Sequence, residues 1–312
     1  MKTEVPAVVA MACLIVITQS FALVLALPFA ESGYQAFPDP ENPINPIIYI
    51  LLILAFTGLI LLAVKLDRKK FIRLLVLIAI FLTMIFVLSV ALFLLFVQFM
   101  EPVIADFASL IVSVAAAIGL TYVSYKHPEW YVVDGVGITV AAGVTAIIGI
   151  SFAILPALIL LIALAVYDAI SVYKTKHMVT LADAVTEQHL PILLVIPKTK
   201  SYSYKEEKSL KEQMQKKKRE AMFMGLGDII IPGALVVSVF TWLPDALFLG
   251  VSARILVALF TMIGTIMGFS ILMRFVLKGN PQAGLPLLNT GAILGFMISY
   301  VVIYGDLLFG IL

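Results

Sequence analysis

Residues 151–173 read SFAILPALILLIALAVYDAISVY, and this stretch indicates the fold class of the chain. Asp168 is its only charged residue. A helix that crosses the hydrocarbon core of a bilayer needs about 20 predominantly apolar residues. The stretch is therefore predicted to be a membrane-spanning helix that carries a single acid.

The same apolar character extends over the whole chain. Of 312 residues, 62% are hydrophobic and 13% are charged, whereas soluble domains average about 45–50% apolar and about 25% charged residues. So much apolar surface does not fit inside one water-soluble core, which excludes the soluble classes. Cys13 is the only cysteine and the three histidines are far apart, so we expect no intrachain disulfide, no metal site and no cofactor.

Charge-free apolar length predicts an all-α membrane protein with nine transmembrane helices in a six-plus-three arrangement. The predicted spans are residues 5–27, 47–64, 71–99, 103–125, 131–150, 151–173, 221–242, 251–277 and 284–311. We expect an N-terminal six-helix membrane bundle (1–173), a hydrophilic cytoplasmic loop (174–220) and a C-terminal three-helix membrane portion (221–312).

The basic residues predict how the chain is oriented, because cytoplasmic connections carry an excess of Lys and Arg. With the N-terminus inside, every Lys and Arg except Arg254 falls on the cytoplasmic side. An odd number of spans then places the C-terminus outside. We expect an integral, multi-pass protein of the cell membrane.

Two carboxyls are predicted to lie at membrane depth, where an ionisable side chain indicates function by default. They are Asp168 and Asp228. Five other charged residues lie within a turn or two of a predicted span end and are interpreted as interfacial: Asp106, Asp134, Arg254, Arg274 and Asp306.

Depth is the first reason to pair the two acids. Asp168 lies six residues before Lys174, or about 9 Å along a helix, and Asp228 lies nine residues after Arg219, or roughly 13 Å. Two carboxyls held close together cannot both ionise, so one keeps its proton while the other remains a base. That is the arrangement an aspartyl protease needs, with one group activating water and the other polarising a peptide carbonyl.

Glycines flank Asp228 and also occur elsewhere in the spans. Gly225 and Gly227 remove side chains just before the acid, which allows another backbone to approach closely; ordinary small-residue helix packing is the alternative. The two GxxxG pairs, Gly264/Gly268 and Gly291/Gly295, are interpreted as packing contacts.

Three motifs in this order resemble the presenilin and signal peptide peptidase family. Tyr167-Asp168 resembles its YD motif, and Gly225-Leu226-Gly227-Asp228 its GxGD motif. Pro286-Leu287-Leu288 stands where the family has Pro-Ala-Leu, with leucine in place of the alanine. Pro286 is otherwise a common helix-start proline. The motifs fall on the sixth, seventh and ninth predicted spans, so the resemblance covers the whole chain.

The resemblance implies an intramembrane aspartic endopeptidase. Asp168 and Asp228 would be catalytic, and the site would be shaped by Tyr167, Gly225, Leu226, Gly227, Pro286, Leu287 and Leu288. Substrates would be transmembrane helices of other proteins, held after local unwinding as an added strand near Pro286. We expect the chain to interact with these substrates and with the lipid bilayer, and not with nucleic acid. The sequence also allows a homo-oligomer.

Other interpretations remain open from the residues alone. A proton- or cation-coupled transporter or channel also uses buried acids, although no inverted repeat is evident. A membrane scaffold could use both acids to bond neighbouring helices. The apolar run Leu190–Ile196 in the loop could cover the active site or lie on the membrane surface.

Overall fold

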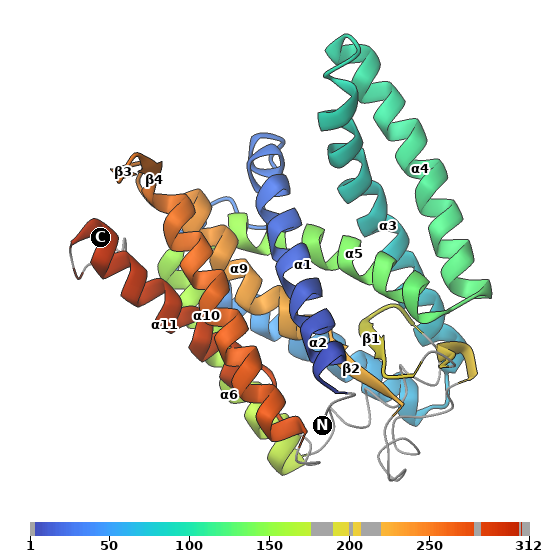
Figure 1. Cartoon of the computed structure of the whole chain (residues 1–312). Coiled ribbons are helices and arrows are strands. Elements are labelled where there is room, and N and C mark those ends of the chain that lie inside the picture. Colours follow the sequence, from blue (N-terminus) through green and yellow to red (C-terminus); the bar gives the residue numbers. More distant parts are fainter. Residues whose placement is uncertain are drawn as a thin grey trace. The chain divides into compact units, whose positions relative to one another are not determined.

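The computed structural model describes residues 4–175, 190–199, 202–206, 220–277, 282–305 and 307. These residues are mostly helical, as Figure 1 shows, in agreement with the predicted class. The helices are α1 (Val5–Glu31), α2 (Asn45–Lys65), α3 (Lys69–Phe96), α4 (Pro102–Lys126), α5 (Trp130–Ser151), α6 (Ile154–Ile170), α9 (Gly227–Trp242), α10 (Ala253–Val276) and α11 (Leu285–Tyr304). The strands are β1 (Leu193–Pro197), β2 (Ala221–Gly225), β3 (Leu247–Phe248) and β4 (Val251–Ser252).

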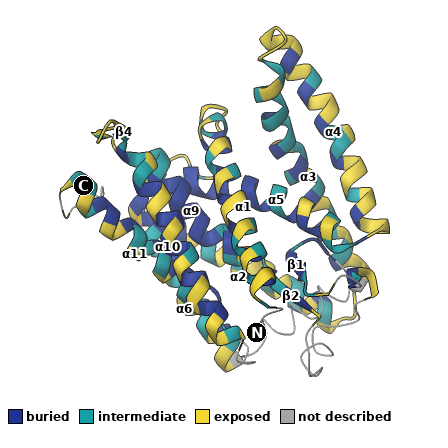
Figure 2. Cartoon of the chain, viewed as in Figure 1, coloured by how far each residue is buried: buried dark blue, intermediate teal, exposed yellow. Residues whose placement is uncertain are grey.

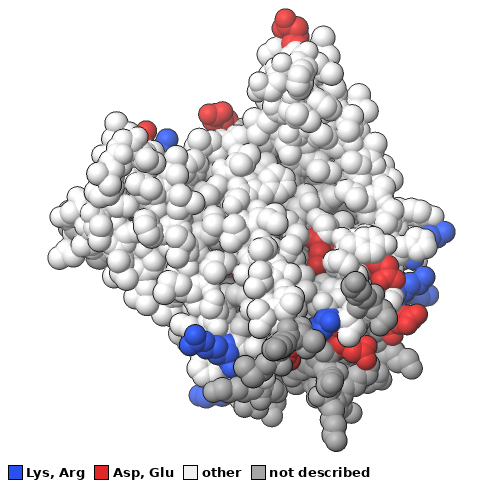
Figure 3. All heavy atoms as spheres, in the orientation of Figure 1, with Lys and Arg blue, Asp and Glu red and all other residues white. Residues whose placement is uncertain are grey.

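Eight of the described helices are long and apolar enough to cross a membrane, and α9 is apolar but shorter. A helix satisfies its own backbone hydrogen bonds, which is why such runs become helices in lipid. Figure 3 shows a surface that is largely uncharged in the view drawn. The chain is an integral, multi-pass membrane protein.

The prediction of a helical span over 221–242 is wrong at its beginning. Residues Ala221–Gly225 form strand β2, and α9 begins only at Gly227. Asp228 therefore lies in the first turn of its helix and is not the eighth residue of a helix that begins at Ala221. The two glycines disfavour helix, and the backbone groups of β2 pair instead with β1.

The described chain divides into two compact units. The first consists of Met1–Met11, Phe56–Gly143 and Val179–Leu226, and the second of Ala12–Ala55, Val144–Met178 and Gly227–Leu312.

The first unit contains the hairpin of α3 and α4 and the β1–β2 sheet (Figure 1). The strands are antiparallel, with Val195 opposite Phe223 in the middle of the pairing. Leu190 and Leu193 belong to the same apolar core as Ile80 and Met84 of α3. Residues 193–196 of the run Leu190–Ile196 thus lie in strand β1, and the run packs through Leu190 and Leu193.

The second unit surrounds α9 with α6, α10 and α11. Helix α9 is buried over almost its whole length, as its dark colour in Figure 2 shows. Its apolar residues Leu235 and Val239 join Leu160 of α6 and Phe296 of α11 in one core. This packing fixes the helices that carry the two acids against each other and against the start of α11.

Glycines allow α10 and α11 to pack backbone against backbone. A Cβ atom on Gly264 would collide with the Gly291 carbonyl oxygen, and one on Gly268 with the Leu287 carbonyl oxygen. A Cβ on Gly295 would lie only 3.1 Å from the Cα of Gly264. The interpretation of the GxxxG pairs as packing contacts is confirmed.

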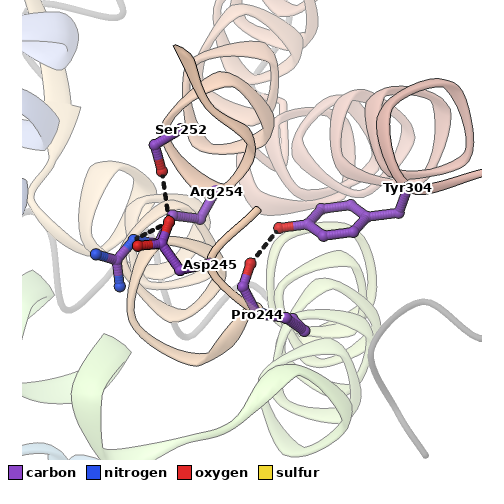
Figure 4. Close-up of polar contacts among 5 residues, drawn as sticks. All are labelled: Pro244, Asp245, Ser252, Arg254 and Tyr304. Atoms are coloured by element: carbon purple, nitrogen blue, oxygen red, sulfur yellow. Dashed lines mark hydrogen bonds and ion pairs between the residues drawn. The ribbon is translucent and has the colours of Figure 1, made fainter. Parts of the chain in front are cut away.

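A polar cluster lies where α9 is connected to α10, next to the C-terminal end of α11 (Figure 4). Arg254 Nε lies 3.6 Å from Asp245 Oδ1, which also accepts a hydrogen bond of 3.0 Å from Ser252 Oγ. The hydroxyl of Tyr304 donates to the Pro244 carbonyl over 2.7 Å. Arg254, predicted to be interfacial, is thus paired; Asp306 lies outside the described residues.

Candidate active site

Asp168 lies at the C-terminal end of α6, and its residue is 4% exposed. The helix ends just beyond it, where Ser171 Oγ donates to the Asp168 carbonyl oxygen over 3.0 Å. A single π-helical turn, Ser171–Thr175, follows. Such turns interrupt the regular α-helical ladder and are frequent at functional sites.

Asp228 lies at the N-terminal end of its helix, in the first turn of α9. The helix begins at Gly227, directly after β2 and Leu226. Pro232 lies inside α9, and because proline has no N–H, the Asp228 carbonyl lacks its usual partner four residues on. The first turn of α9, which carries this acid, therefore lacks one helical hydrogen bond.

The two acids lie against neighbouring residues at the start of α11, Asp168 against Leu285 and Asp228 against Gly284. The Leu285 backbone N–H donates to Asp168 Oδ2 over 3.1 Å. The position that a Cβ atom would take on Gly284 lies 2.9 Å from both Cγ and Oδ2 of Asp228. The structure thus places both Asp168 and Asp228 at the Gly284–Leu285 dipeptide.

The start of α11 contributes electrostatics as well as shape. The first N–H groups of a helix have no partner within the helix, and here Asp168 of α6 accepts the one from Leu285. Pro286 occupies the next position, where its missing N–H costs nothing. The N-terminal ends of α9 and α11 favour negative charge nearby, which offsets part of the cost of burying carboxylates.

Tyr173 ties the end of α6 to the segment before α11. Its hydroxyl donates to Gln282 Oε1 over 2.9 Å and accepts a hydrogen bond of 3.3 Å from the Ala283 N–H. One turn into α11, Asn289 Nδ2 donates to the Leu161 carbonyl of α6 over 2.8 Å. These three hydrogen bonds hold Gly284 and Leu285 on either side.

Comparison with known proteins agrees with this geometry. The sequence model of the family described as signal-peptide peptidase, presenilin aspartyl protease matches residues 12–304. The chain belongs to this family. Two solved structures of a presenilin family intramembrane aspartate protease are each 34% identical to it. The first, in space group C222, has a TM-score of 0.67, and the match covers 95% of this chain and 99% of the solved chain. The second, in space group P2, has a TM-score of 0.65, and the match covers 94% of this chain and 97% of the solved chain. A sequence search of curated proteins finds no match.

The comparisons confirm the resemblance that the motifs suggested, and they give no support to a transporter. The enzyme is an intramembrane aspartyl protease. No group of three His, Cys, Asp or Glu residues that could hold a metal ion occurs in the part of the chain that the structure describes. Two carboxyls can carry this chemistry, because a carboxylate can act as the base that activates water.

The structure places the predicted site residues of this presenilin-family protein in both units. Tyr167, Gly227, Pro286 and Leu287 lie in the second unit with the two acids, and there Leu288 is fully buried. Gly225 and Leu226 belong to the first unit, where the Leu226 side chain packs 3.4 Å from the Cβ position of Gly137.

Three residues near the acids were missed in the sequence: Gly284, Leu285 and Tyr173. Gly284 acts by lacking a side chain and Leu285 through its backbone, so residue type alone gives no signal. Tyr173 resembles any interfacial tyrosine. The proximity of Gly284 to the Pro286 motif was the one usable indication.

Asp134 corrects a further prediction, since it was interpreted as interfacial. It is 5% exposed, and its Oδ1 accepts a hydrogen bond of 2.7 Å from the Val195 N–H within the first unit. Asp134 lies only four residues into α5, which suggested an interfacial position. Its burial could not be expected, because Val195, its hydrogen-bond partner, lies in a strand that the sequence did not indicate.

Proposed function

We propose that Asp168 and Asp228 are the catalytic pair with which this protease hydrolyses peptide bonds inside the transmembrane helices of its substrates. The observation that supports the assignment is their convergence on Gly284 and Leu285. Tyr167 and the Pro286–Leu288 segment flank these groups in the chain and would shape the site around them.

In the proposed reaction, the ionised carboxyl removes a proton from water while the protonated one donates a hydrogen bond to the scissile carbonyl oxygen. The resulting hydroxide adds to the carbonyl carbon and forms a tetrahedral intermediate. Transfer of a proton to the amide nitrogen then allows the C–N bond to break, and the two acids exchange protonation states. Leu285 N–H keeps Asp168 oriented without adding a titratable group.

A helix hides its peptide bonds in its own hydrogen bonding, so the substrate segment needs to unwind first. An extended segment recovers hydrogen bonds by adding to the edge of a sheet. Among the described residues, the strand closest in the chain to a catalytic acid is β2, which ends three residues before Asp228. We propose the edge of β2, rather than an edge near Pro286, as the place where the unwound segment pairs.

We further propose that the N-terminus is cytoplasmic, the C-terminus is outside, and the nine spans follow the six-plus-three arrangement with α9 as the seventh. The distribution of Lys and Arg supports this topology. We also propose the cell membrane as the location.

Cleavage of a reporter with one transmembrane helix, reconstituted in liposomes with the full chain, tests the catalytic assignment. We expect the wild type to cut within the span, and folded Asp168→Asn and Asp228→Asn to lose at least about 100-fold of the rate. Asp106→Asn, an exposed carboxyl of α4, is the control and should retain activity. If either catalytic variant cuts normally, the two-aspartate mechanism is wrong; if both unfold, the acids are structural.

A further inference from the structure

Asp134 is a buried carboxyl that the proposed reaction does not use. Its Oδ1 accepts the Val195 N–H of β1 over 2.7 Å, although Asp134 itself lies in the spanning helix α5. Burying a carboxyl is unfavourable unless hydrogen bonds compensate, and polar groups within spanning helices usually serve a function. The contact therefore requires an explanation beyond packing.

The register of the sheet shows which way the Val195 N–H points. Lys198 N–H donates to the Glu220 carbonyl over 2.8 Å, and Leu226 N–H donates to the Ile192 carbonyl over 3.2 Å. In an antiparallel ladder, alternate residues face the partner strand. The residues of β1 that face away from β2 are therefore Leu193, Val195 and Pro197.

This outer edge of β1 is closed to another strand. An edge accepts a strand only through free N–H and C=O groups. Asp134 occupies the N–H of Val195, and Pro197 has none. The outer edge of β2 presents Ala221, Phe223 and Gly225, all of which carry an N–H. No strand within the described ranges pairs with that edge of β2.

We propose that Asp134 is a positioning residue for the substrate: it anchors β1 to α5 and closes the outer edge of β1, so an extended substrate segment adds only at β2. The inference rests on the proposed function, in which the unwound segment pairs with this sheet. Strands lie about 4.8 Å apart, so segments added at the two edges would lie about 14 Å apart. Closing β1 therefore limits the added segment to one of these two positions.

Two substitutions separate the hydrogen bond from the charge of Asp134. Asp134→Asn keeps a side-chain oxygen that can accept the Val195 N–H, whereas Asp134→Leu removes the acceptor at similar size. Glu129→Leu is the matched control. Glu129 Oε1 accepts a hydrogen bond of 2.9 Å from Ser203 Oγ, so the control removes another contact of the same unit without touching β1.

The full chain in detergent is first examined by amide hydrogen exchange of the peptide that contains Val195. Asp134→Leu should increase exchange of that amide by about 10-fold or more, while Asp134→Asn and Glu129→Leu should leave it unchanged. Cleavage kinetics with the single-span reporter follow. Asp134→Leu should raise KM about 10-fold and lower kcat by less than about 3-fold, and the asparagine variant should resemble the wild type.

Three results would overturn the inference: unchanged Val195 exchange in Asp134→Leu, an unchanged KM in that variant, or equal loss in the asparagine variant. If Asp134→Leu does not fold, Asp134→Ser, which is too short to reach Val195, replaces it. If Asp134→Leu has an unchanged KM and Asp168→Asn is inactive, the role of Asp134 is rejected and the proposed function is retained. A wild type that cleaves no reporter rejects the proposed function, and this inference with it.

Discussion

Gly284→Ala adds a single methyl group next to the carboxyl of Asp228. The position of that methyl lies 2.9 Å from Cγ and Oδ2 of Asp228 and 3.0 Å from Oδ1, whereas ordinary contacts begin at 3.4 Å. The carboxyl therefore has to move by about 0.5 Å, which is the tolerance within which catalytic groups need to be held. A misplacement of about 1 Å can cost about 100-fold in rate, so we expect kcat to fall by about 10- to 100-fold.

The backbone itself does not oppose this substitution. Gly284 has φ −78° and ψ −49°, which alanine adopts readily. Asp228 can rotate away from the methyl group, so the free energy of unfolding should change by less than about 1 kcal/mol. Activity and stability should thus separate, which a general packing defect would not allow.

The assay is cleavage of the single-span reporter in liposomes, with thermal unfolding measured on the same preparations. Gly119→Ala in α4, where the added Cβ meets nothing within 4 Å, is the control and should retain the wild-type kcat. A folded Gly284→Ala enzyme with the wild-type kcat would show that the reacting Asp228 carboxyl does not lie next to Gly284. The proposed site geometry would then be wrong.

Three further substitutions test the surroundings of the acids. Tyr173→Phe removes the hydroxyl that contacts Gln282 and the Ala283 N–H. The rate of reporter cleavage should fall by about 3- to 10-fold with little change in melting temperature. An unchanged rate would exclude a positioning role for Tyr173. Gly268→Ala places a methyl group against the Leu287 carbonyl; unfolding in detergent should show a loss of about 1–3 kcal/mol, which a wild-type melting temperature would contradict. Asn289→Leu removes the bond to the Leu161 carbonyl; a loss of about 0.5–1.5 kcal/mol is expected, and a stabilised protein would refute the contribution of this bond.

The spanning helices and the two acids could be predicted from the sequence because their signals are local. An apolar run long enough to cross lipid has few alternatives to a helix. Asp168 and Asp228 stand out because the runs around them are otherwise without charge. Their order along the chain with Pro286 then matched one known family.

The strands could not be predicted in the same way. Residues 193–197 and 221–225 are apolar and five residues long, and each is too short to be told from the end of a helix by its periodicity. Their pairing joins segments separated by more than twenty residues of a polar loop. Asp134 was misjudged as a consequence, because the Val195 N–H that it accepts is visible only once β1 exists.

The length of α9 has a consequence for how water reaches the reaction. Its 16 residues rise about 24 Å, while the hydrocarbon core of a typical bilayer is about 30 Å thick. Helix α9 is enclosed by α6, α10 and α11, so protein and water rather than acyl chains fill the difference. Because Asp228 lies at the very start of this short helix, water that fills the difference at that end would reach the acid.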